Sequence, residues 1–382
     1  MTKSTPPVAL KIPKKLEIHN DVRVDNYYWM NNREDEKVIA YLNEENNYYS
    51  VLTKHTKDFQ GLLFNEMKGR IKEDDASVPY KNNGYWYATR FEKGKEYPIY
   101  SRRKGEETAD EEIMFNCNEL AVGHEYFKLG GLSISPNNQL VAFAVDTVSR
   151  REYTLQVKNL KTGEVYSDKI DKTTGRSVWA DDNKTFFYTQ KDPVTLRSDK
   201  IYRHVLGTPA NTDVLVYHEE DETFNAFVYK TKSKKYIVIG ASSTLTSEYR
   251  FIKADAPESE FKVFSKRQRG LEYGIAHYRD KFYILTNKDK ALNFKLMICN
   301  ETETSSDKWE EFIPHREDVL LEDMTIFKDF LVLEERENGL GRIRIIRWDG
   351  SKDYYLPFAE ETYAAYVFGN PEFDTPWLRF GY

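Results

Sequence analysis

The sequence contains only two cysteines, Cys117 and Cys299, among 382 residues. Because their spacing fits neither a disulfide framework nor a metal-binding motif, we expect two reduced thiols and a cytoplasmic protein. No stretch approaches the roughly 18 apolar residues of a membrane helix, and the opening residues lack the apolar core of a signal peptide. The formal net charge of −6 gives no excess of basic groups. We therefore expect neither a membrane nor a nucleic acid as a partner.

The common catalytic and cofactor-binding motifs are also missing from the sequence. The stretch nearest to a GxSxG nucleophile motif, Gly130–Ser135, lacks the last glycine and leads into a strand-like run. No dinucleotide-binding, phosphate-loop, zinc-protease or EF-hand pattern is present. The seven histidines are scattered, which is typical of structural or surface positions. We predict no catalytic residue, no metal ligand and no cofactor-binding residue in this chain.

Two short charged runs interrupt the β-prone part of the sequence. Glu219–Glu222 is acidic, and Lys266–Arg269 carries three basic residues. Runs of like charge usually lie in solvent. We interpret both as solvated loops.

Aromatic residues, in contrast, are abundant: the chain has 27 Tyr, 22 Phe and 6 Trp. Aromatic and β-branched side chains favour strands, which indicates an all-β protein. From Val78 onward, β-prone runs recur with starts 45 to 55 residues apart. They begin at Tyr85, Leu140, Thr185, Tyr236, Phe282, Phe330 and Trp377.

The repeating unit has four strands, because the first six runs are each followed by two more strand-like runs and most are preceded by one. A four-stranded unit of this length is typical of a β-propeller blade, whose sheet buries its faces only by stacking on neighbouring blades. The repeats predict a seven-bladed β-propeller over residues 76–382. A set of β-sandwiches is the alternative fold, but it does not explain the seven-fold regularity.

Residues 1–75 have a different, helical period. Asn32–Asp35 supplies an N-cap signal, and apolar residues from Val38 to Leu52 then recur at helical spacing. A second set, from Phe59 to Ile71, predicts another helix. The fold class expected is therefore an all-β propeller with an N-terminal α-helical extension that offers no strands.

The seventh unit is incomplete in this sequence. It contains two strand-like runs, at Tyr366 and Trp377, before the last residue, Tyr382. We expect a truncated last blade and a chain that is part of a longer protein. An uncovered sheet edge favours pairing with another chain, so we also expect a tendency to self-associate.

Specific stretches of the sequence resemble the prolyl oligopeptidase family of serine peptidases, and within it the oligopeptidase B (protease II) branch. The segment His19–Trp29 resembles the N-terminal signature of the family. Further similar stretches are RIKEDDASVPY, RFEKGKEYPIYSRR, NELAVGHEYFKLG, RREYTLQVKNLKTGE, VWADDNKTFFYT, LRSDKIYRHVLGT and HREDVLLE.

The resemblance implies that this propeller covers a C-terminal α/β-hydrolase domain of the same polypeptide, which this chain does not contain. The Ser-Asp-His triad of the family lies in that domain, so none of it is assigned to a residue here. The helical extension, residues 1–75, is expected to pack on the hydrolase. The implied function is a size filter for a peptidase that cleaves short peptides after Lys or Arg. Peptides then enter either by the propeller pore or by opening of the domains.

Two further interpretations concern motion between the domains. Glu125, Arg150 and Arg151 lie in stretches that resemble family segments near the domain interface, and they are interpreted as a reversible latch. The stretch from Ile71 to Tyr80, including Pro79, is interpreted as a hinge.

A different class of function stays open from the sequence. A free-standing propeller could act as a scaffold or ligand-binding module without enzymatic activity. It would bind its partner at the pore mouth or rim and need no hydrolase domain.

Overall fold

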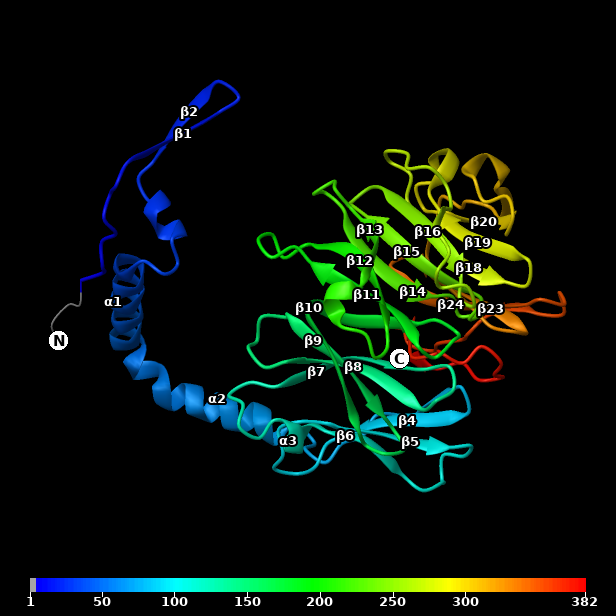
Figure 1. The fold of residues 1–382 in the computed structure, drawn as a ribbon, viewed down its shortest axis with the longest axis horizontal. Coiled ribbons are helices and arrows are strands. Elements are labelled where there is room, and N and C mark those ends of the chain that lie inside the picture. The colour runs from blue at the N-terminus through cyan, green and yellow to red at the C-terminus, as the bar shows by residue number, and fades with distance from the viewer. Residues whose placement is uncertain (1–4) are drawn as a thin grey trace. The chain divides into compact units, whose positions relative to one another are not determined.

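The computed structural model describes residues 5–382 of the chain (Figure 1). It divides into two compact units, Met1–Glu73 and Asp74–Tyr382. Within residues 5–382, none of the helices combines the length and the apolar character needed to span a bilayer.

The first unit begins with a β-hairpin, which the sequence interpretation missed. Strands β1 (Lys14–Ile18) and β2 (Asp21–Asp25) pair antiparallel, with Ile18 opposite Asp21. His19 and Asn20 form the two-residue turn, and both have positive φ, as a type I′ turn requires. The expectation of a purely helical extension was therefore wrong. The signal that could have found the hairpin is the His19–Asn20 pair, because both residue types tolerate the left-handed conformation.

Two helices follow, as predicted. Helix α1 covers Glu36–Thr53 and α2 covers Lys57–Gly69, with short 3₁₀ turns η1 (Tyr28–Asn31) before them and η2 (Lys54–Thr56) between them. The N-cap of α1 is Asp35, whose carboxylate accepts a 2.9 Å hydrogen bond from the Lys37 amide. Asn32 precedes this cap and does not form it, because η1 still occupies the chain up to Asn31.

The apolar face that predicted the helices is mostly uncovered. Val38 is the only buried residue of α1, and α2 has none. Leu42, Phe59, Leu62 and Met67 are each at least half exposed. The apolar residues that recur at helical spacing therefore form an exposed face on the two helices.

The second unit consists of antiparallel meanders in which each strand pairs with the next along the chain. Their strands are β3 (Tyr80–Asn82), β4 (Tyr85–Arg90), β5 (Ile99–Lys104) and β6 (Glu112–Asn116); β7 (Lys128–Ile134), β8 (Leu140–Asp146), β9 (Tyr153–Asn159) and β10 (Val165–Trp179); β11 (Thr185–Lys191), β12 (Ser198–Val205) and β13 (Val214–His218); β14 (Asn225–Lys230), β15 (Tyr236–Ser242), β16 (Ser247–Lys253) and β17 (Lys262–Val263); β18 (Tyr273–Tyr278), β19 (Lys281–Thr286), β20 (Lys295–Asn300) and β21 (Glu310–Ile313); β22 (Val319–Ile326), β23 (Phe330–Glu337), β24 (Leu340–Arg347) and β25 (Asp353–Tyr355); and β26 (Tyr366–Val367) with β27 (Phe380–Gly381). The short helices α3 (Cys117–Leu120), η3 (Ala210–Thr212), η4 (Lys288–Lys290) and η5 (Ser306–Lys308) lie in the connections.

Strand β10 belongs to two meanders at once. Its beginning pairs with β9 and its end pairs with β11, so β7 to β13 form one continuous seven-stranded sheet. The sequence interpretation had placed two separate strands here. They join because the pairing shifts register on both sides of Thr173, and positive φ at Lys172 and Gly175 bends the strand without ending it.

Buried apolar side chains fill the spaces between consecutive sheets. Five clusters do so, and a sixth lies between the two parts of the seven-stranded sheet; the cluster between β14–β17 and β18–β21 is mostly aromatic. In it the rings of Phe264 and Phe282 meet edge to face, with centroids 5.0 Å apart. Many of the aromatic side chains that are abundant in the sequence therefore pack between neighbouring sheets.

Polar contacts join the last sheet to the first. The Asn83 amide donates a 2.8 Å hydrogen bond to the Glu372 carboxylate. The Arg379 guanidinium donates one, also 2.8 Å, to the Val78 carbonyl. Together with the six clusters, these contacts connect the sheets in a complete circle, in which the red C-terminal segment meets the cyan first sheet (Figure 1).

Candidate functional site

The meander pattern gives the second unit two distinct ends. In each sheet the turn between the first and second strands lies at one end, and the connection between the second and third strands lies at the other. Hydrogen bonds link the first kind of turn from sheet to sheet. In order around the circle, the linked pairs are Asn83–Asn138, Asn137–Asn183, Asp181–Lys230, Ser233–His277, Tyr278–Lys328, Lys328–Asp374 and Glu372–Asn83. We call this end the turn end and the opposite one the loop end.

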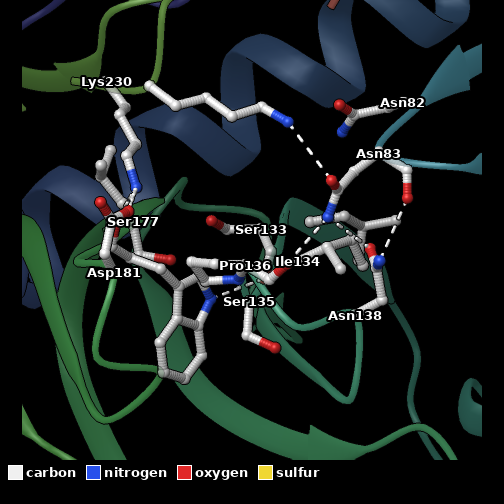
Figure 2. A pocket seen from close by; sticks show the side chains of 14 residues that line it. Asn82, Asn83, Ser133, Ile134, Ser135, Pro136, Asn138, Ser177, Asp181 and Lys230 are labelled. Carbon is white, nitrogen blue, oxygen red and sulfur yellow. Dashed lines mark hydrogen bonds and ion pairs between the residues drawn. The ribbon is translucent and has the colours of Figure 1, made fainter. Parts of the chain in front are cut away.

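A cavity of about 300 Å³ opens among the first strands at the turn end (Figure 2). Its lining comes from β3, β7, β10 and β14 and the turns that follow them. Trp179 Nε1 donates to the Ser133 carbonyl at 2.9 Å, and Lys230 forms a 2.5 Å ion pair with Asp181. The lining is mixed, with asparagine, serine and lysine side chains beside Ile134 and Pro136.

The three residues interpreted as a latch all lie at the loop end. Glu125 precedes β7, and Arg150 and Arg151 lie between β8 and β9. The Asp146 carboxylate holds this loop by accepting the Arg151 amide at 2.8 Å, while all three latch side chains are exposed. Within residues 5–382 none of them forms an ion pair, and all three remain accessible to a partner surface.

The loop end also carries a row of exposed apolar side chains that the sequence interpretation missed. They lie in the connections β4–β5, β8–β9, β11–β12, β15–β16 and β19–β20, and each is at least 41% exposed. In chain order they are Phe91, Val148, Val194, Leu245 and Leu292. The available signal was an apolar residue within a short connection rich in polar residues, as Val148 is in the β8–β9 connection. We call these five residues the apolar rim.

The two charged runs meet at the loop end through Glu219 and Arg267, while the other residues of both runs are exposed, as the sequence interpretation expected. Glu219 is only 4% exposed and accepts hydrogen bonds from Arg267 at 2.5 Å and from the Tyr217 hydroxyl at 2.5 Å. Burial raises the pKa of Glu219, but these hydrogen bonds outweigh it and leave the pKa below its usual value. Arg267 also lies over the Phe224 ring, 3.8 Å from its centroid.

A cleft of about 600 Å³ lies beside this pair, lined by the connections β13–β14, β15–β16 and β17–β18. Asp221, Thr246 and Arg269 are among the residues that line it. The sequence could not predict the Glu219–Arg267 contact, because 48 positions separate the two residues and only the stacking of sheets brings them together.

The boundary between the two units falls within the stretch interpreted as a hinge. Ile71 belongs to the first unit and is exposed, whereas Pro79 and Tyr80 belong to the second. Tyr80 opens β3 and stacks on Tyr87, with ring centroids 5.4 Å apart. The Ser77 amide donates to the Thr89 carbonyl at 2.8 Å, so the end of this stretch is already attached to the sheet.

The two cysteines are free and buried, and burial raises the pKa of Cys117 to about 11 and that of Cys299 to about 12. His204 and His277 are buried, and both ring nitrogens of each are hydrogen-bonded. Among residues 5–382, no three His, Cys, Asp or Glu side chains gather closely enough to hold a metal ion.

Comparison with known proteins identifies this architecture. A family model described as the prolyl oligopeptidase N-terminal β-propeller domain matches residues 6–382. The chain therefore belongs to the prolyl oligopeptidase family.

The chain is 39% identical to dipeptidyl aminopeptidase BI of Pseudoxanthomonas mexicana, over 99% of its own length and 55% of the relative. It is 32% identical to protease 2 of Moraxella lacunata, over 97% of the chain and 54% of the relative. Among solved structures, oligopeptidase B from Leishmania major superposes with a TM-score of 0.91 and 29% identity, covering 98% of this chain and 57% of that one. The chain thus spans about half the length of the relatives it matches.

Proposed function

We propose that this chain is the propeller part of an oligopeptidase B-like serine peptidase and acts as its lid and size filter. In this proposal the catalytic domain is a C-terminal α/β-hydrolase domain of the same polypeptide, and the substrates are short peptides cleaved after Lys or Arg. The proposal gives the propeller seven blades, with β26 and β27 in the last of them. The observation that carries the proposal is the apolar rim together with the charged residues beside it.

The apolar rim supports docking of a second domain at the loop end. Exposed apolar groups gathered at one end of a protein mark an interaction surface, and burying them gains about 25 cal/mol per Å². Arg150 and Arg151 are exposed in the same connection as Val148, and the exposed Glu125 lies at the same end of the second unit. An interface of apolar contacts with a charged margin is typical of domains that separate and reassociate.

The uncovered face of α1 and α2 supports the same arrangement. The apolar side chains of both helices need a partner surface, and the proposed hydrolase domain supplies one. We place the proposed hinge near Ile71, because Tyr80 is held in the first sheet by stacking on Tyr87. The location that we propose is the cytoplasm, where the two free cysteines would stay reduced.

The proposal predicts that this chain alone does not cleave peptides. We expect residues 1–382 to give no turnover of a Lys or Arg ester above the blank, and the complete polypeptide to give turnover that a serine-directed reagent abolishes. The measurement is ester hydrolysis by both proteins at equal molar concentration. Turnover by the chain alone that the same reagent blocks would contradict the proposal.

A second prediction concerns the latch. Charge reversal by Arg151→Glu in the complete protein is expected to shift the ratio of open to closed forms by up to about fivefold, since a surface ion pair contributes at most about 1 kcal/mol. The matched control is Lys161→Glu, which makes the same change at an exposed position of the turn end. Small-angle scattering and peptide turnover report the ratio. If the Arg151 variant and the Lys161 variant give the same scattering profile and the same peptide turnover, the latch is refuted.

A further inference from the structure

The cavity at the turn end has a polar wall in which several hydrogen-bonding groups are already used (Figure 2). The Lys230 ammonium is paired with Asp181 and also donates to the Trp179 carbonyl at 3.2 Å. The Asn83 side chain donates to the Asn138 side-chain oxygen, and the Asn138 side chain donates to the Asn83 carbonyl, both at 3.1 Å. These contacts hold the wall in place.

Two further donors of the same wall lack a strong partner. Ser177 is only 9% exposed, and its hydroxyl oxygen is buried without a hydrogen-bond partner within residues 5–382. A buried hydroxyl of this kind is unfavourable, because it has lost its bonds to water. In the part of the chain that the structure describes, the Lys234 ammonium donates only to the Asn83 side chain, over 3.3 Å, as a dashed line in Figure 2 shows. Both donors line the cavity and can bind an acceptor within it.

The charged side chains of the wall leave one positive charge in excess. Lys230 and Lys234 are the cations of the lining, and Asp181 is its anion. Because Lys230 and Asp181 form a close pair, the uncompensated charge is that of Lys234. A ligand with a single negative charge balances it, whereas a dianion or a zwitterion does not.

The rest of the wall is largely apolar, and the space is small. Leu132, Ile134 and Val178 line the cavity beside the polar groups. A volume of about 300 Å³ is at the lower limit for small-molecule sites, which combine apolar walls with a few placed polar groups. The wall therefore fits a short apolar chain that ends in one charged group.

We propose that this cavity is a binding site for a small organic monocarboxylate, with Lys234 and Ser177 as donors to the carboxylate. An ammonium and a hydroxyl both donate to carboxylate oxygens, and the charged donor gives the stronger bond. Ser177 belongs to β10 and Lys234 to the β14–β15 turn, so a bound carboxylate connects these two segments. The site lies at the opposite end from the apolar rim, and the inference does not depend on the proposed function.

The test is a calorimetric titration of the 382-residue chain with sodium butyrate at constant ionic strength. We expect saturable binding with a Kd of about 1 mM, which is typical of a ligand with so few atoms. Two probes change the charge: 2-aminobutyrate adds an ammonium to the same carbon chain, and inorganic phosphate carries a second negative charge. Each should bind at least about fivefold more weakly than butyrate. No saturation below about 50 mM butyrate, or equally tight binding of either probe, overturns the monocarboxylate site.

Two variants test the assigned donors by the same titration. Lys234→Met removes the charge at an exposed residue and should raise the Kd for butyrate at least about tenfold. Ser177→Ala removes a hydroxyl that has no partner within residues 5–382, so it should raise the Kd at least about threefold without lowering the urea midpoint.

The matched control is Lys184→Met, which makes the same change at an exposed lysine of the turn end outside the cavity lining. Its Kd for butyrate should stay within about twofold of wild type, because salt screens a charge that does not touch the ligand. Equal Kd values in the Lys234 and Lys184 variants overturn the site. If Lys234→Met does not fold, the comparison of Ser177→Ala with Lys184→Met decides in the same way.

Discussion

Replacing His204 with leucine is expected to lower the free energy of unfolding by about 3–5 kcal/mol, because it leaves buried carboxylates without their partner. His204 is completely buried, with Nδ1 2.7 Å from Asp213 and Nε2 2.9 Å from Asp168. Asp168 lies in β10, where that strand pairs with β9, and His204 lies in β12. The imidazole thus joins β12 to the part of β10 that pairs with β9. Urea unfolding of the 382-residue chain measures the loss.

The contribution of His204 should depend on pH. Burial lowers its pKa, but the hydrogen bonds to Asp213 and Asp168 outweigh burial, so the folded-state pKa is raised. Asp168, Asp213 and, through Asp213, the Tyr188 hydroxyl are the titratable groups that face it. Since the pKa in the unfolded chain is about 6.5, the added stability is fully present below that pH. It is lost as the pH rises through the folded-state value.

The matched control for this substitution is His218→Leu. His218 is partly exposed and lies 3.4 Å from Asp199, so its removal should change stability by no more than about 0.5 kcal/mol. The difference between wild type and the His204 variant should also shrink from about pH 6 to about pH 9, whereas the His218 difference stays small. Equal losses in the two variants would refute the network as a source of stability.

The strand positions were predictable because each strand is a local run of aromatic and β-branched residues bounded by turn residues. Leu140–Asp146 and Tyr153–Asn159, for example, are strands over the same residues that the sequence indicated. The continuity of β10 was not predictable in this way. The residues Asp171–Gly175 look like a turn between two strands in the sequence. In the structure they are a bend within β10, because this strand pairs with β9 on one side and with β11 on the other.

The chemistry of the loop end depends on distances that a sequence pattern does not contain. The Glu219 run looked solvated because its own neighbours are acidic, but its partner Arg267 comes from the next sheet. The apolar rim consists of single residues in separate connections, each unremarkable alone. Only the circular stacking of sheets turns such isolated residues into a surface.

Gly131→Ala is expected to cost about 3–5 kcal/mol, because the strain of positive φ in a non-glycine residue adds to a backbone clash. Gly131 has φ of +58°, and a Cβ there would lie 1.4 Å from the Gly175 carbonyl oxygen. The control Gly163→Ala has the same strain, with φ of +78°, but no atom within 4 Å of its Cβ. It should cost only about 1 kcal/mol. Urea unfolding of both variants separates the clash from the strain, and equal costs would contradict the close contact.

The glycines of the stretch Gly130–Ser135, which is the nearest to a nucleophile motif in the sequence, have a structural role in packing β7 against β10. Pairing between β7 and β8 shifts register between Gly130 and Ser133, which is where Gly131 meets Gly175 of β10. The Ser133 carbonyl accepts the Trp179 indole of the same strand at 2.9 Å. Both contacts bring β7 and β10 together in the wall of the cavity at the turn end. The glycines therefore serve backbone packing beside this cavity, so the loss in Gly131→Ala should appear as lowered stability of the propeller itself.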